Sequence, residues 1–126
     1  QNVCCFPCFP IQTKRIITMN MNEYQELASR TGNIEDNKSK VLCNYALGLN
    51  GEAGEAADIL KKHIFHGHPL DREEFAKELG DCLWYVSQLA RLAGYTLEEI
   101  AVMNIEKLKK RYPNGFKTSD SIHRVV

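Results

Sequence analysis

Two long stretches with helical periodicity are joined by a short link, and this pattern constrains the fold more than any other feature. Apolar side chains recur every three to four residues before and after residues 66–70, as they do in helices that bury one face. In the link, Gly67 predicts a helix end and Pro69 prevents its continuation, whereas Asp71 and Glu74 predict the start of the next helix. The sequence therefore predicts an antiparallel helical hairpin.

The core faces of this hairpin can be read from the same periodicity. The face predicted for the first helix comprises Leu42, Tyr45, Ala46, Leu49, Ala53, Ala56, Leu60 and Ile64. The face predicted for the second comprises Phe75, Leu79, Cys82, Leu83, Val86, Ala90 and Ala93. Trp84 lies opposite the second face, which predicts an outward side chain.

Each predicted helix also carries a pair of acidic residues three positions apart. Glu52 and Glu55 occur in GLNGEAGEAADILKK, and Glu78 and Asp81 occur in ELGDCLWYV. Residues three apart share a helix face, so each pair directs two carboxylates the same way. The pairs lie at the edges of the apolar faces, where crowded carboxylates require a cation, a hydrogen-bond donor or a proton.

The two acidic pairs can meet across the hairpin. At 1.5 Å per residue, they lie roughly 20 Å and roughly 14 Å from the link, about one turn apart in height. A single such pair is commonly part of a solvated face, but two pairs at matched heights predict four converging carboxylates. Oxygen ligands of this kind suit Mg²⁺.

A third predicted helix begins at a capping box formed by Thr96 and Glu99 and ends before Pro113. Its predicted core face is Leu97, Ala101, Ile105, Leu108 and Tyr112. At the edge of that face lie Asn104, Lys107 and Arg111. The two cations could simply complement the helix dipole. Beside a carboxylate cluster they would instead suit a polyphosphate, and Lys62 is a weaker candidate for the same role.

Three segments together resemble the MazG-like all-α nucleoside triphosphate pyrophosphohydrolases. These are GLNGEAGEAADILKK, ELGDCLWYV and the N-x-x-KLKKRYPNGF block, and the resemblance extends over about residues 21–116. It implies an all-α bundle of four to five helices that assembles as a homodimer or as a tetramer of two dimers. It also implies cleavage of a (deoxy)nucleoside triphosphate between its α and β phosphates, in the house-cleaning of nucleotide pools.

The resemblance also implies a role for each matched residue. Glu52, Glu55, Glu78 and Asp81 would hold Mg²⁺, for which Mn²⁺ could substitute. Lys107 and Arg111 would contact phosphates, and Asn104 would contact the substrate. Lys62 remains the weaker candidate for phosphate contact that its position on the helix suggests. The four carboxylates together with Lys107 and Arg111 would form the catalytic site, and Asn104 and Lys62 would serve only in substrate binding. An outward Trp84 would serve a subunit interface or a base-stacking wall.

Composition is compatible with these expectations. The chain has 126 residues, 44% of them hydrophobic, with a net charge of zero and a pI near 7.1. We expect one domain with no membrane segment and no nucleic-acid partner, because duplex DNA is normally bound by basic proteins. Cys43 and Cys82 are expected to be buried or inert thiols in the reducing cytoplasm.

The first eighteen residues differ from the rest. They contain Cys4, Cys5 and Cys8, which could bind zinc but lack a second C-x-x-C partner. We expect residues 1–18 to be an artificial addition or an upstream extension outside the fold, residues 19–116 to form the helical domain, and residues 117–126 to be a tail.

Several alternatives remain open. The GLNG segment could be a turn that breaks the first long helix. A di-iron bundle would need Glu-x-x-His elements, which neither acidic pair provides. His63, His66 and His68 fit helix-end cations better than a transition-metal site. The alternative to an enzyme is a non-catalytic helical module that binds a nucleotide or a protein.

Overall fold

The computed structural model describes residues 18–32 and 37–123, and all of its named elements are helices. Their bounds are α1 Met21–Ser29, α2 Lys38–His66, α3 Arg72–Leu92, α4 Leu97–Arg111 and α5 Thr118–Ile122. The prediction of an all-α fold is confirmed. The short helix α5 lies in the segment expected to be a tail, and residues 1–17 lie outside the described part.

The helix ends are set by local chemistry. Gly67 ends α2 in the left-handed conformation with φ of 73°, which glycine adopts without strain. The Asp71 carboxylate accepts hydrogen bonds from the first turn of α3. Thr96 and Glu99 form the predicted capping box of α4, whose two reciprocal hydrogen bonds satisfy free N–H groups. The predicted hairpin and both of its end signals are confirmed.

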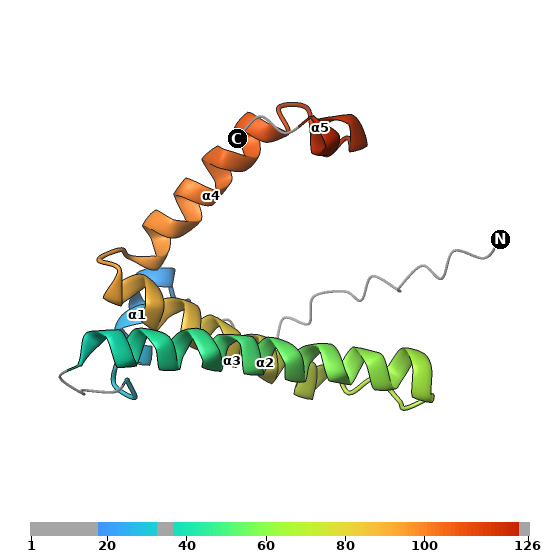
Figure 1. The fold of residues 1–126 in the computed structure, drawn as a ribbon, viewed down its shortest axis with the longest axis horizontal. Helices are drawn as coiled ribbons and strands as arrows, with labels where there is room; N and C mark the ends of the chain where they lie inside the picture. The colour runs from blue at the N-terminus through green and yellow to red at the C-terminus, as the bar shows by residue number, and fades with distance from the viewer. Residues whose placement is uncertain (1–17, 33–36, 124–126) are drawn as a thin grey trace.

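The helices α2 and α3 form a long antiparallel hairpin, and α1 packs against α3 (Figure 1). An aromatic cluster joins them, in which Trp84 makes edge contacts with Tyr45 at 5.4 Å and Tyr85 at 5.0 Å between ring centroids. The Trp84 indole N–H donates to the carbonyl of Ala28 at 3.1 Å and to the Thr31 hydroxyl at 2.9 Å. The expectation of an outward Trp84 is therefore wrong, because α1 covers that side of α3.

A buried amide fastens α1 to the turn between α3 and α4. The Gln25 side chain donates to the carbonyls of Ser87 at 3.2 Å and Tyr95 at 3.1 Å, and it accepts from the Leu97 amide at 3.1 Å. Leu97 itself is only 2% exposed. Since buried backbone groups without partners are costly, this network fixes where α4 begins.

Helix α2 runs without interruption through Gly48, Gly51 and Gly54, so the alternative of a turn at GLNG is wrong. A Cβ atom at Gly51 or Gly54 would have no neighbour within 4 Å outside its own helix. At Gly48 it would lie 2.6 Å from the hydroxyl oxygen of Tyr85 and closer still to its ring. Of these three glycines, Gly48 is therefore the one at which α3 approaches α2 most closely.

The apolar faces predicted for the hairpin are only partly buried. On α2, Tyr45 and Ala56 are buried as expected, whereas Leu42, Ala46, Ala53 and Ile64 are exposed. On α3, Leu79, Leu83 and Ala93 are exposed and Ala90 is buried. Each predicted face thus combined residues that are buried with residues that are exposed, because apolar side chains occur on more than one side of each helix.

Helix α4 leaves the hairpin at a wide angle (Figure 1). Only its start is buried, against α1 and α3. Its predicted core face holds only in part: Ala101 and Tyr112 are partly buried, but Ile105 is 50% exposed and Leu108 37%. Val102 and Met103 are also more than half exposed. Within the described ranges, these apolar side chains of α4 are thus left uncovered.

Two further expectations concern accessibility. Cys43 is exposed rather than buried, and Cys82 is partly buried. Among the described residues, no helix combines the length and apolar character needed to cross a membrane.

Candidate metal centre

The facing sides of α2 and α3 bring three carboxylates together. Glu52, Glu55 and Glu78 each offer an oxygen, and these oxygens all lie within 4.8 Å of one another. Glu52 and Glu78 are partly buried, whereas Glu55 is exposed. The helical hairpin thus places side chains that are 23 to 26 positions apart in the sequence at one point on its surface.

The electrostatics of this cluster are repulsive. The pKa of Glu78 is raised by its loss of hydration and then by the charges of Glu55, Glu52 and Asp81, in that order, with Glu74 also contributing. Among the described residues, each charge that shifts this pKa is therefore negative. Removing its proton accumulates like charges, so the cluster favours a proton or a cation.

Asp81 lies beside the cluster rather than within it. Its carboxylate is not part of the 4.8 Å group, although its charge acts on Glu78. The same charge helps to raise the pKa of Tyr24 on α1, after the larger effect of burial. The structure thus brings together three of the four predicted ligands and places the fourth nearby, with a tyrosine from α1 at its side.

The donor set fits a hard divalent cation. Mg²⁺ and Mn²⁺ prefer carboxylate oxygens, and the three glutamates supply several without any histidine or thiolate. The pKa of Glu78 is raised first by its loss of hydration and then by the neighbouring carboxylates, both of which a bound cation would offset. Glu52, Glu55 and Glu78 are therefore the residues that could hold Mg²⁺, with Asp81 at the edge.

A cavity of about 450 Å³ adjoins this cluster on the side of the hairpin link, and Glu55, Glu78, Asp58 and Lys62 are among its lining residues. Asp58 pairs with Lys62, whose ammonium nitrogen lies 2.6 Å from its carboxylate, and also with Lys61. These contacts lower the pKa of Asp58 to about 2. Lys62 thus supplies positive charge close to the predicted ligands.

The predicted substrate residues of α4 lie elsewhere in the single chain. Asn104, Lys107 and Arg111 belong to the part of α4 that extends away from the hairpin (Figure 1), and none of them is among the groups that shift the pKa of Glu78. The Nε atom of Arg111 is enclosed and has no hydrogen-bond partner within the described residues. One copy of the chain does not join these cations to the carboxylates.

Sequence reasoning missed the two tyrosines near the site. Tyr85 crosses α2 at Gly48, one turn from Glu52, and Tyr24 lies near Asp81. The glycines at positions 48, 51 and 54 indicate that a ligand or another helix approaches α2 closely, and of these three the structure shows such an approach only at Gly48. No local pattern could have placed Tyr24, because its position depends on how α1 packs.

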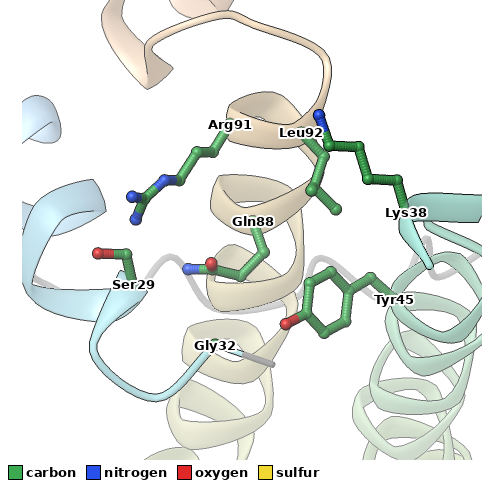
Figure 2. A pocket seen from close by; sticks show the side chains of 7 residues that line it. All are labelled: Ser29, Gly32, Lys38, Tyr45, Gln88, Arg91 and Leu92. Carbon is green, nitrogen blue, oxygen red and sulfur yellow. The ribbon is translucent and has the colours of Figure 1, made fainter. Parts of the chain in front are cut away.

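A second cavity, of about 320 Å³, lies beyond the aromatic cluster, where the C-terminal half of α3 faces the start of α2 (Figure 2). The hydroxyl of Tyr45 and the amide of Gln88 point into it, and Lys38 and Arg91 stand at its rim. Tyr45 precedes Glu52 by seven residues, or about 10 Å along the helix. This cavity is thus separate from the carboxylate cluster.

Comparison with known proteins adds to this geometry. Residues 42–116 match the model of the MazG nucleotide pyrophosphohydrolase domain. The chain belongs to the MazG family. It is also 33% identical, over 105 residues, to the "Gene 37 protein" of Mycobacterium phage L5, a match that covers 77% of this chain and 92% of the phage protein. No solved structure is significantly similar. The MazG match contains the three glutamates, Asp81 and the cations of α4, whereas Tyr24 lies before it.

Proposed function

We propose that this protein is a Mg²⁺-dependent nucleotide pyrophosphohydrolase. It would cleave a (deoxy)nucleoside triphosphate between the α and β phosphates, giving the monophosphate and pyrophosphate, and so serve the house-cleaning of nucleotide pools. The observation that carries this proposal is the convergence of Glu52, Glu55 and Glu78 from two facing helices of a MazG domain. The family suggests the reaction, and the cluster supplies the donor set that the reaction needs.

The roles of the residues follow from their positions. The three glutamates and Asp81 would hold Mg²⁺, which supplies charge neutralisation for the triphosphate and a water of lowered pKa. Lys62, at the adjoining cavity, would attract the terminal phosphates. Lys107 and Arg111 would stabilise charge that builds up on the phosphate oxygens, Arg by its forked donors and Lys as a point charge.

A second copy of the chain is the partner that would bring those cations to the site. In one copy, α4 carries Lys107 and Arg111 away from the hairpin. Its exposed apolar side chains include Val102 and Met103, and the hairpin exposes Leu79 and others. Burial of apolar surface drives association, and the basic end of α4 complements the acidic cluster in charge. We therefore propose a homodimer, alone or within a tetramer, in which α4 of one copy serves the carboxylates of the other.

The activity is tested by measuring pyrophosphate release from a panel of nucleoside and deoxynucleoside triphosphates with and without Mg²⁺. Release should require the metal and be abolished by Glu78→Gln, which keeps the size of the side chain and removes its charge. A suitable matched control is Glu74→Gln, because Glu74 lines the adjoining cavity but is not in the carboxylate group. A folded protein that binds Mg²⁺ and releases no pyrophosphate from any substrate would instead indicate the non-catalytic nucleotide- or protein-binding module.

The shared site is tested by mixing two inactive variants, Glu78→Gln and Arg111→Ala, under conditions in which subunits exchange. In a two-fold symmetric dimer with random pairing, half of the dimers are mixed and each contains one intact site, so activity should recover to about a quarter of the wild-type value. No recovery, with exchange shown by differently tagged subunits, would mean that each copy uses its own α4.

A further inference from the structure

Helix α4 joins the rest of the described structure at its N-terminal end. It contacts α1 and α3, and its first residue, Leu97, is 2% exposed. Val102 and Met103, little more than one turn further on, are already more than half exposed. Beyond that point the helix projects away from the hairpin (Figure 1). The direction of a helix of 15 residues is therefore set by contacts at one end.

The cations of α4 lie toward the other end of this helix. At 1.5 Å per residue, Lys107 lies about 15 Å and Arg111 about 21 Å along the helix from Leu97. A tilt of about 10° at the first turn would move Arg111 sideways by about 4 Å, which exceeds the length of a hydrogen bond. Whatever fixes the first turn thus determines which groups the two cations can reach.

Two polar side chains of α1 hold that first turn. The Asn22 amide donates to the Glu98 carboxylate at 2.9 Å, and its oxygen accepts from the Glu98 N–H at 3.3 Å. The Gln25 oxygen accepts from the Leu97 N–H at 3.1 Å. The first N–H groups of a helix have no partner within the helix and point along its axis. Two acceptors on consecutive N–H groups therefore constrain the direction of α4.

The two acceptors are themselves fixed to the hairpin. Asn22 and Gln25 are three positions apart on α1 and so share one of its faces. Gln25 also donates to the carbonyl of Ser87 on α3 at 3.2 Å and to that of Tyr95, just before α4, at 3.1 Å. It is 6% exposed, and a buried amide with three partners has little freedom to move. Helix α1 thus joins the start of α4 to α3.

We propose that Asn22 and Gln25 are positioning residues, which direct α4 so that its cations reach the carboxylates of the other copy. This inference rests on the proposed function, in which α4 of one copy serves the other. Neither residue belongs to the carboxylate group, and α1 precedes residues 42–116, which match the family model. Both act through the direction of α4, without touching the substrate.

A positioning role and a purely structural role differ in which copy of a dimer needs these residues. A residue that only stabilises the fold is needed equally in both copies. A residue that positions α4 is needed in the copy that supplies α4, but not in the copy that supplies the carboxylates. Mixed dimers separate the two roles.

The experiment adds Asn22→Ala to one or the other of the inactive variants Glu78→Gln and Arg111→Ala before they are mixed. The intact site of a mixed dimer takes α4 from the Glu78→Gln copy and the carboxylates from the Arg111→Ala copy. Asn22→Ala in the Glu78→Gln copy should lower the kcat of the mixture by about 10-fold or more, because a misplacement of about 1 Å can cost about 100-fold. In the Arg111→Ala copy it should leave the kcat unchanged.

A second readout does not depend on turnover. The unmixed Asn22→Ala protein should bind inorganic triphosphate, in the presence of Mg²⁺, about 3-fold to 10-fold more weakly than the wild type, the usual effect of one lost hydrogen bond. Its titration with Mg²⁺ alone should match that of the wild type, because the carboxylates are untouched.

The choice of variants separates direction from stability. The bonds between Asn22 and Glu98 lie at the surface, where water replaces a lost partner, so Asn22→Ala should melt close to the wild type. Gln25→Met should have the same one-sided effect, and Asn22→Ala decides the outcome if Gln25→Met fails to fold. Glu98→Gln keeps an acceptor for Asn22 and should retain most of the activity that Glu98→Ala loses. The matched control is Glu26→Gln, an exposed position of the same helix.

Three outcomes would overturn the inference alone. Asn22→Ala could lower the kcat equally from either copy, it could fail to lower it from the Glu78→Gln copy, or it could leave the affinity for inorganic triphosphate unchanged. In each case the mixture without Asn22→Ala still recovers activity, so the proposed function stands. If that mixture recovers no activity although subunits exchange, the shared site and this inference both fail.

Discussion

Replacing Gly48 by alanine tests the close approach of the two hairpin helices. In a helix, Gly→Ala normally stabilises by about 1 kcal/mol, because alanine loses less backbone freedom on folding. At Gly48, however, the new methyl group would overlap the ring of Tyr85. Gly51, one turn further along the same helix, has no neighbour within 4 Å of the Cβ position outside its own helix, and it is the matched control.

The expected difference in stability can be worked out from the contacts that the Tyr85 ring would lose. Inserting a methyl group into a packed contact usually costs about 1 to 3 kcal/mol. Displacing the Tyr85 ring costs a similar amount, because it loses edge contacts to Trp84 and Tyr45, each worth about 0.5 to 1.5 kcal/mol. Both alanine variants gain the same helix propensity, so the difference between them isolates the steric cost. At about 4 °C per kcal/mol for a domain of this size, their melting temperatures should differ by roughly 4 to 12 °C.

Thermal unfolding followed by circular dichroism measures this difference. We expect Gly51→Ala to melt slightly above the wild type and Gly48→Ala to melt well below Gly51→Ala. In a Tyr85→Leu background, which removes the ring, the cost of Gly48→Ala should largely disappear, as a double-mutant cycle would show. Equal melting temperatures for the two alanine variants would refute the close approach of Tyr85 to α2.

The remaining predictions concern the carboxylate cluster and two tertiary anchors. The pKa of Glu78 is raised, so the folded protein holds the proton of this carboxyl more tightly than the unfolded chain does. The stability of the metal-free protein should therefore fall as the pH rises from about 4.3, the ordinary glutamate value, through the raised pKa. Glu78→Gln should reduce that fall in melts recorded with a chelator, and an identical slope in both proteins would contradict the raised pKa of Glu78. Trp84→Phe should lower the unfolding free energy by about 1 kcal/mol in urea titrations, because it removes the hydrogen bonds to Ala28 and Thr31. Thr96→Ala should cost about 1 kcal/mol through loss of the α4 cap and should raise the lowered pKa of Glu99, which NMR titration can follow.

The hairpin could be predicted because its determinants are local. Gly67 and Asp71 act through their own backbone and side-chain geometry, and these effects depend little on the rest of the chain. The same holds for the heights of the acidic pairs, since a helix has a fixed rise per residue. Glu52, Glu55 and Glu78 therefore meet as predicted, whereas Asp81 stands aside. Periodicity places Asp81 on the same side of α3 as Glu78, but it does not determine which of the two carboxylates comes within reach of α2.

The packing of Trp84 could not be predicted from its own helix. Opposite the predicted core face, a tryptophan has an outward position only if no other element covers it. Here α1 returns across α3, and the indole N–H is accepted by the carbonyl of Ala28 in α1 and by the hydroxyl of Thr31, just after the end of α1. The contact joins residues more than fifty positions apart in the sequence, so its existence depends on a tertiary arrangement rather than on a helical period.

Periodicity has a second limit, which concerns the apolar residues that are exposed in the single chain. Periodicity identifies which side of a helix is apolar, but it does not say whether that side meets the same chain or another one. Ile105 and Leu108 on α4, like Leu79 and Leu83 on α3, have the spacing of core residues and are exposed. Two copies in the complete unit would explain both observations. A second copy would cover the exposed apolar surfaces, and it would bring the basic end of α4 to the acidic cluster. The core predicted from the sequence would then be the core of the dimer, which the mixing of Glu78→Gln with Arg111→Ala directly tests.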